Sequence, residues 1–126
     1  MDQLRILFVD DDADLRRIVK DQLVPQGFVM DEAEDGAKAI AMLEKGNYNL
    51  MLLDINMPVK SGIDVLKFIK EKGLPCKVIM LTGRVGFSVA TETLKLGADD
   101  YITKPFNIDY LLFAIKRVLG NSETPA

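Results

Sequence analysis

Residues 5–12 read RILFVDDD, a short apolar run that ends in three consecutive carboxylates. Residues 49–54, NLMLLD, and 77–83, KVIMLTG, also end in polar groups, and residues 100–105, DYITKP, end in a lysine and a proline. Apolar runs of this length are typical of strands buried on both faces, as in a parallel sheet. Open parallel sheets bind ligands beyond the carboxyl ends of their strands. The pattern therefore predicts that these polar groups converge on one edge of a sheet.

The composition indicates one globular domain. The chain has 126 residues, 48% hydrophobic and 28% charged, with a net charge of −3. This charge argues against a nucleic-acid surface. The sequence has no 18-residue apolar run and no signal-peptide pattern, so we expect no membrane contact. The single Cys76 excludes an internal disulfide and fits a cytoplasmic location. Without histidine, the chain cannot build a serine triad or a histidine phosphocarrier site.

Strand-like and helix-like segments alternate five times along the chain. The predicted strands are 5–9, 28–33, 49–54, 77–82 and 100–103. The predicted helices follow them: the first begins near Asp12, the second begins after Asp35-Gly36, the third carries Ile63 and ends at Lys72-Gly73, the fourth spans about Gly86 to Leu96, and the fifth follows Asn107. Asp12 and Asn107 are predicted caps. The apolar stripes that we expect to face the core are Leu15, Ile18, Val19 and Leu23; Ala37, Ile40, Ala41 and Leu43; Ile63, Leu66, Phe68 and Ile69; Val89, Ala90, Thr93 and Leu94; and Ile108, Leu111, Leu112, Ile115, Val118 and Leu119.

Alternating strands and helices with short connections predict right-handed βαβ units. We therefore predict an α/β fold: a flavodoxin-like, doubly wound, five-stranded parallel sheet of order 2-1-3-4-5 with five helices. The order reverses between the first and third strands, whose ends carry Asp10, Asp11 and Asp54. Residues 1–120 are predicted to form one domain, with 121–126 as a flexible tail or the start of a linker.

The acidic triplet at residues 10–12 has two interpretations. Asp12 can cap the following helix. Capping does not explain three adjacent carboxylates, whose repulsion is costly unless a cation neutralises it. Mg²⁺ prefers hard oxygen ligands, and carboxylates from two strands would supply them. On the triplet alone, metal binding and capping remain equally supported.

Asp54 ends an apolar strand, where it is either a turn-forming residue or a carboxylate nucleophile that accepts a phosphoryl group. Such a transfer needs cations on the phosphoryl oxygens, which a metal and Lys104 can supply. Thr82 offers a hydroxyl donor, and Gly83 leaves room for a bulky anion. Taken singly, Thr82 is equally an ordinary strand residue and Lys104 a surface lysine.

Together these residues resemble the receiver domain of bacterial two-component response regulators, in particular the chemotaxis-regulator type. The resemblance rests on VDDD at 9–12, LDINMP at 53–58, SG at 61–62, LTG at 81–83 and GADDYITKPF at 97–106. It covers about residues 4–120. The resemblance implies that Asp54 is the phosphoacceptor and that Mg²⁺ is the cofactor, bound by Asp11, Asp54 and the Asn56 backbone carbonyl, with Asp10 assisting through water.

The resemblance also implies that Thr82 and Tyr101 form a switch pair and that Lys104 binds the phosphoryl group. Gly83 departs from the family, which often has alanine there. Arg84 occupies a position where the family varies its dephosphorylation rate.

The implied function is a phosphorylation-dependent signalling switch rather than an enzyme with a separate substrate. The implied partners are a sensor histidine kinase or phosphotransfer protein, and an output partner or an output domain after Ala126. A homodimer through the helix at about 86–96, the strand at 100–103 and the last helix is left open.

Two other functions compete with this interpretation. An aspartyl-nucleophile phosphohydrolase typically has Asp-x-Asp, whereas the second position here is Asn56, which cannot transfer protons. A receiver-like binding module would signal without phosphate, which the set Asp11, Asp54, Thr82 and Lys104 argues against. Neither glycine-rich nucleotide motif is present.

Overall fold

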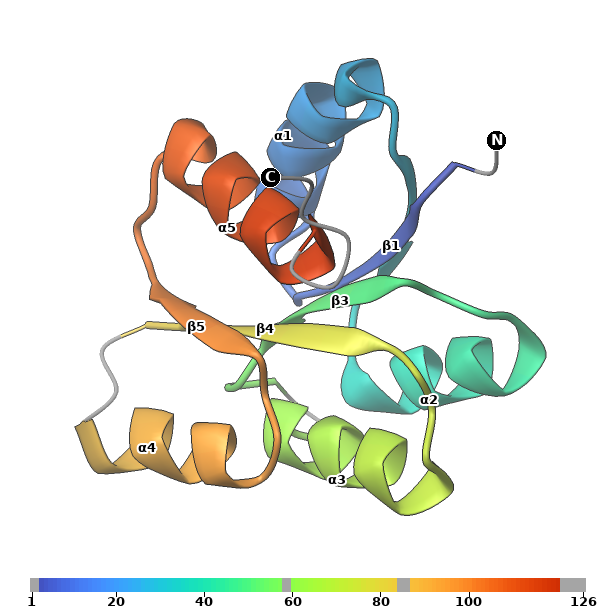
Figure 1. The fold of residues 1–126 in the computed structure, drawn as a ribbon, viewed down its shortest axis with the longest axis vertical. Helices are drawn as coiled ribbons and strands as arrows, with labels where there is room; N and C mark the ends of the chain where they lie inside the picture. Colours follow the sequence, from blue (N-terminus) through green and yellow to red (C-terminus); the bar gives the residue numbers. More distant parts are fainter. Residues whose placement is uncertain (1–2, 58–59, 84–86, 121–126) are drawn as a thin grey trace.

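A computed structural model describes residues 3–57, 60–83 and 87–120, with the backbone alone for 87–90. It has three layers (Figure 1): α1 and α5 cover one face of a central sheet, and α2, α3 and α4 cover the other. All neighbouring strands pair in parallel, in the order β2-β1-β3-β4-β5. The predicted flavodoxin-like α/β fold is therefore confirmed. The expectations for Arg84 and the tail at 121–126 lie outside the described residues.

The strands are β1 (Arg5–Val9), β2 (Val29–Ala33), β3 (Leu50–Asp54), β4 (Lys77–Thr82) and β5 (Asp100–Thr103). Three agree with the predicted bounds, and β2 and β3 each begin one residue later than predicted. Asn49 nevertheless continues the ladder, since its amide donates to Arg5 O at 2.9 Å and its carbonyl accepts from Lys77 N at 3.0 Å.

The helices are α1 (Ala13–Leu23), α2 (Gly36–Lys45), α3 (Gly62–Lys72), α4 (Phe87–Lys95) and α5 (Ile108–Gly120), with a 3₁₀ turn at Val24–Gln26. The predicted caps are present: the Asp12 carboxylate accepts from the amides of Asp14 and Leu15, and the Asn107 side chain accepts from Tyr110 N at 2.7 Å. Each cap satisfies amides that have no partner within the helix.

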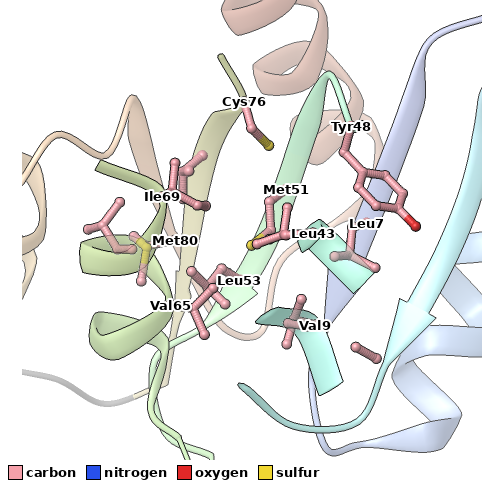
Figure 2. Packing of buried hydrophobic residues seen from close by; sticks show 14 of the residues in the cluster. Leu7, Val9, Leu43, Tyr48, Met51, Leu53, Val65, Ile69, Cys76 and Met80 are labelled. Atoms are coloured by element: carbon pink, nitrogen blue, oxygen red, sulfur yellow. The ribbon is translucent and has the colours of Figure 1, made fainter. Parts of the chain in front are cut away.

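The core consists of two clusters, one on each face of the sheet. Alternation along β1 sends Leu7 and Val9 into one cluster and Ile6 and Phe8 into the other. Figure 2 shows the first cluster, where strand side chains meet those of the covering helices. Its labelled members include Leu7, Val9, Leu43, Met51, Leu53, Val65, Ile69 and Met80. The three central strands β1, β3 and β4 are thus packed from both sides, as their apolar sequences predict.

Parts of the helical stripes were predicted wrongly. Ile18 is 51% exposed and Leu94 is 41% exposed, although both were expected to face the core. Val19 and Leu23, four residues apart on α1, are the residues that reach the sheet, so Ile18 lies beside the buried stripe. On α2, Ala37 and Ala41 are exposed while Ala39 and Leu43 are buried. Alanine is small enough to be tolerated on either face, so it locates a stripe poorly.

Gly62 lets α3 pack directly against the end of β3. A Cβ atom on Gly62 would lie 2.2 Å from Asp54 O and 2.9 Å from Ile55 Cα. The Gly62 amide also donates to Ile55 O at 3.0 Å. A side chain here would push backbone against backbone, so the position of Asp54 depends on this glycine.

We expect Gly62→Ala to lower the free energy of unfolding by about 1–3 kcal/mol, the usual cost of overpacking. Urea denaturation would measure it. Gly46→Ala is the matched control, because its Cβ would meet nothing closer than Met42 O at 3.9 Å. Equal stability of Gly62→Ala and the wild type would contradict the close approach.

Candidate functional site

Four strands deliver polar side chains to one edge of the sheet. Asp10 follows β1, Asp54 ends β3, Thr82 ends β4 and Lys104 follows β5. Lys104 Nζ lies 2.6 Å from Asp10 Oδ2 and 3.6 Å from Asp54 Oδ1. Residues 94 positions apart in the sequence therefore form one cluster. The Lys104–Pro105 peptide bond is cis.

Three carboxylates of this cluster are close enough to share a cation. Oxygens of Asp10, Asp11 and Asp54 all lie within 4.8 Å of one another. Asp10 and Asp54 are buried and Asp11 is exposed, so the group opens to solvent on one side. Hard oxygens from two buried strands, with an open side for water, fit the coordination that Mg²⁺ requires. The donor set is therefore compatible with the expected metal.

Hydrogen bonds orient the two buried carboxylates. The Asp12 amide donates to Asp10 Oδ1 at 3.0 Å, and Lys104 Nζ donates to the other oxygen. The Asn56 amide donates to Asp54 Oδ1 at 3.4 Å. Asp10 thus has a partner on both oxygens, whereas Asp54 is held more loosely. Of these two carboxylates, Asp54 is the one whose second oxygen, Oδ2, has no hydrogen-bond partner among the residues that the structure describes, so it is available for chemistry.

The electrostatics single out the same residue. Burial, reinforced by the Asp10 carboxylate, raises the pKa of Asp54 from 3.8 to about 6, against the opposing attraction of Lys104. Burial alone would lower the pKa of Lys104, but its hydrogen bond to Asp10 and the attraction of both carboxylates raise it above the ordinary value. At neutral pH the site therefore holds an ionised carboxylate beside a fixed ammonium.

Thr82 has an unsatisfied hydroxyl. Its Oγ1 is buried and, among the described residues, has no hydrogen-bond partner. A buried polar atom without a partner costs about 1–3 kcal/mol. Its backbone carbonyl, by contrast, accepts from Lys104 N at 2.6 Å. Thr82 therefore has a donor free for a ligand at the same edge of the sheet as Asp54.

Tyr101 lies in the strand next to Thr82. In the β4–β5 register Thr82 pairs with Thr103 and Met80 pairs with Tyr101, so Thr82 and Tyr101 point to the same face of the sheet. Tyr101 is half-buried and packs against the cluster that contains Met80. The structure places the two side chains on one face, two positions apart in register.

The sequence analysis missed Arg16. Its guanidinium on α1 donates to the backbone carbonyl of Asp10 at 2.6 Å and pairs with Glu32 of β2 at 3.0 Å. The neighbouring Arg17 instead faces solvent and pairs with Asp14. The sequence does not distinguish two adjacent arginines on a helix. Only the rotation of α1 about its axis determines that Arg16 faces the Asp10 carbonyl and Arg17 faces solvent.

A family model for the response regulator receiver domain matches residues 6–116. The chain belongs to this family. Receiver domains act in two-component signalling, so the coarse functional prediction is confirmed. Within the described residues, no helix is both long and apolar enough to cross a membrane.

Relatives differ in how much of their length this receiver domain covers. It is 40% identical to the chemotaxis protein CheY of Bacillus subtilis over 92% of this chain and 98% of that protein. It is also 40% identical to the transcriptional regulatory protein DltR of Streptococcus agalactiae over 90% of this chain, but spans only 50% of DltR. The response regulator TrrA of Thermotoga maritima, crystallised in complex with Mg²⁺–BeF, is 37% identical with a TM-score of 0.82, covering 93% of this chain and 100% of that one.

The raised pKa of Asp54 predicts a stability effect with a definite sign. Folding disfavours the ionised form, so the Asp54 charge lowers stability increasingly as the pH rises from about 4 through about 6. In EDTA at pH 7.5, Asp54→Asn should therefore be more stable than the wild type by about 1–3 kcal/mol, since each pKa unit is worth about 1.4 kcal/mol. The difference should shrink towards pH 4.

Chemical denaturation at several pH values would measure this difference. Asp21→Asn removes an exposed carboxylate from α1 and serves as the control, with little expected change. An Asp54→Asn variant no more stable than the wild type at pH 7.5 would contradict the electrostatic account.

Proposed function

We propose that this receiver domain is a signalling switch in which Asp54 accepts a phosphoryl group from a partner histidine kinase, a phosphotransfer protein or a small phosphodonor. The observation that carries the proposal is the convergence of Asp54 with Asp10, Asp11 and Lys104 at the carboxyl edge of the sheet. A nucleophilic carboxylate, a cation-binding group and a fixed ammonium are the parts that phosphoryl transfer to an aspartate requires.

In the proposed reaction an Asp54 carboxylate oxygen forms a bond to phosphorus. The bond from phosphorus to the donor's nitrogen or oxygen breaks, and its electron pair leaves with the donor. Lys104, already held between Asp10 and Asp54, would bind an oxygen of the incoming group. Attack of water on phosphorus would later release phosphate and restore Asp54. The phosphoryl group is thus gained and lost at Asp54 of the domain itself.

Asp10, Asp11, Asp54 and the Asn56 backbone carbonyl are the groups that would hold Mg²⁺. The ion, when bound, would offset the negative charge on the phosphoryl oxygens. Asn56 would contribute through its backbone and not as an acid or base. The Asn56 side-chain amide cannot transfer a proton, and this disfavours a phosphohydrolase function.

Thr82 and Tyr101 would convert the phosphorylation into a change of surface. A phosphoryl oxygen on Asp54 would give the unsatisfied Thr82 hydroxyl an acceptor, and hydrogen bonds to charged groups are worth about 1.5–3 kcal/mol. Movement of Thr82 towards Asp54 would leave space on the face that it shares with Tyr101. Tyr101 could then turn inward, and a bias of a few kcal/mol is enough to shift such a population.

The partners follow from the same proposal. The chain spans about half of DltR, which supports an output domain beyond residue 126, while its match along nearly all of CheY supports action through a separate partner. Leu94 on α4 and Tyr110 and Phe113 on α5 are exposed, and apolar side chains on the two helices that flank β5 would favour a homodimer or an output contact there. A cytoplasmic location remains part of the proposal.

Incubation with acetyl phosphate and Mg²⁺ should add one phosphoryl group, detected by intact mass and removed by hydroxylamine. Asp54→Asn should abolish the gain because it removes the nucleophile, and EDTA should suppress it in the wild type. Asp64→Asn, at an exposed residue of α3, is the control. Full labelling of Asp54→Asn would refute the assignment of Asp54.

Beryllofluoride, which mimics the phosphoryl group, should change the aromatic-ring NMR signals of Tyr101. Thr82→Ala should largely remove this response because it lacks the hydroxyl. Thr82→Ser, which keeps the hydroxyl, should retain it. Identical Tyr101 spectra with and without the mimic would exclude the coupling even if Asp54 is phosphorylated.

A further inference from the structure

Arg16 links the acidic loop, residues 10–12, to the neighbouring strand β2. It lies in the first turns of α1, yet its side chain is only 16% exposed. Its Nη1 donates to Asp10 O at 2.6 Å, and its Nε donates to Glu32 Oε1 at 3.0 Å. The guanidinium therefore bridges the backbone of one strand end and a side chain of the next strand.

The hydrogen bond from Arg16 fixes the Asp10 carbonyl, which belongs to the Asp10–Asp11 peptide. The Asp10 amide is already bonded to Ala33 O of β2 at 3.1 Å. Arg16 adds a bond to the carbonyl of the same residue, and Glu32, which holds Arg16, directly precedes Ala33. Because a peptide unit is planar, fixing Asp10 O also fixes the direction in which the chain enters Asp11. The Asp10–Asp11 peptide plane, and with it the backbone direction into Asp11, is thus held from β2 through Arg16.

Arginine suits this role better than lysine. Its planar fork offers two nitrogens to two acceptors at once, whereas a lysine ammonium would have to choose one or lie between them. Glu32 also faces Lys20 Nζ at 3.6 Å, but the Lys20 side chain is 45% exposed. Arg16, paired with Glu32, therefore connects β2 to the acidic loop through a partly buried charge.

We propose that Arg16, held by Glu32, is a positioning residue that sets the Asp10–Asp11 backbone for binding Mg²⁺. The inference rests on the proposed function, since it assumes that these carboxylates receive the ion. A purely structural ion pair would stabilise the fold without altering affinity for the ion. The two roles are separated by measuring affinity and stability in the same variants.

The experiment titrates the metal-free protein with MgCl₂ by calorimetry, with the Asp11 amide followed by NMR. Arg16→Ala should weaken Mg²⁺ binding by roughly 10-fold or more, the usual effect of removing a partner that orients a ligand. Arg16→Lys, which keeps the charge, should also weaken binding because it cannot bridge both acceptors. Glu32→Gln keeps an acceptor without the charge and should lie between Arg16→Ala and the wild type.

Arg17→Ala is the matched control. Arg17 is the next residue on α1, and both it and its partner Asp14 are largely exposed. The Arg17→Ala variant should bind Mg²⁺ with the affinity of the wild type. In acetyl phosphate assays, Arg16→Ala should need more Mg²⁺ for half-maximal rate while its rate at saturating Mg²⁺ stays close to that of the wild type.

Wild-type Mg²⁺ affinity in Arg16→Ala or Arg16→Lys would overturn the proposal, and so would an equal loss in Arg17→Ala. A fall in stability without a fall in affinity would do the same. Arg16→Lys provides the decisive comparison if Arg16→Ala does not fold. If the wild type binds no Mg²⁺, the proposed function fails and this inference fails with it.

Discussion

The ion pair between Lys104 and Asp10 joins the two ends of the functional edge. It connects the loop after the last strand with the loop after the first, across a distance of 94 residues in the sequence. Asp10 is buried and would be costly as a lone charge, so Lys104 and the Asp12 amide make its burial tolerable. The same ammonium lies within 4 Å of Asp54. The geometry of the acidic cluster thus depends on one cation from a distant strand.

The core supplies the rigidity that this site requires. Carboxylates within 4.8 Å of one another repel, and burial together with this repulsion raises the pKa of Asp54. The apolar strands beneath them are packed from both faces, so the strand ends cannot move apart to relieve it. Thr82 adds an unsatisfied hydroxyl at the same edge. An edge whose polar groups destabilise the fold locally, supported by a well-packed sheet, is typical of a functional site.

Sequence patterns predicted elements best where one physical rule dominated. Strands that are apolar throughout can only be buried on both faces, so their existence and order were predictable. The caps Asp12 and Asn107 were predictable because a short polar side chain satisfies free amides locally. Ile18 and Leu94 were misplaced, because which side of an apolar stripe meets the sheet depends on how the helix is rotated in the tertiary packing.

The sequence by itself determined which polar residues end or follow each strand, since apolar runs and the residues after them are local properties of the chain. That information was enough to place Asp10, Asp54, Thr82 and Lys104 at one edge. Only the tertiary structure decided which groups touch. It places Lys104 closer to Asp10 than to Asp54, leaves the Thr82 hydroxyl without a partner in the described part of the chain, and brings Arg16 rather than Arg17 to the Asp10 backbone. The physical reason is that hydrogen bonds and ion pairs require separations fixed to tenths of an ångström, which depend on strand register and helix rotation across the whole domain.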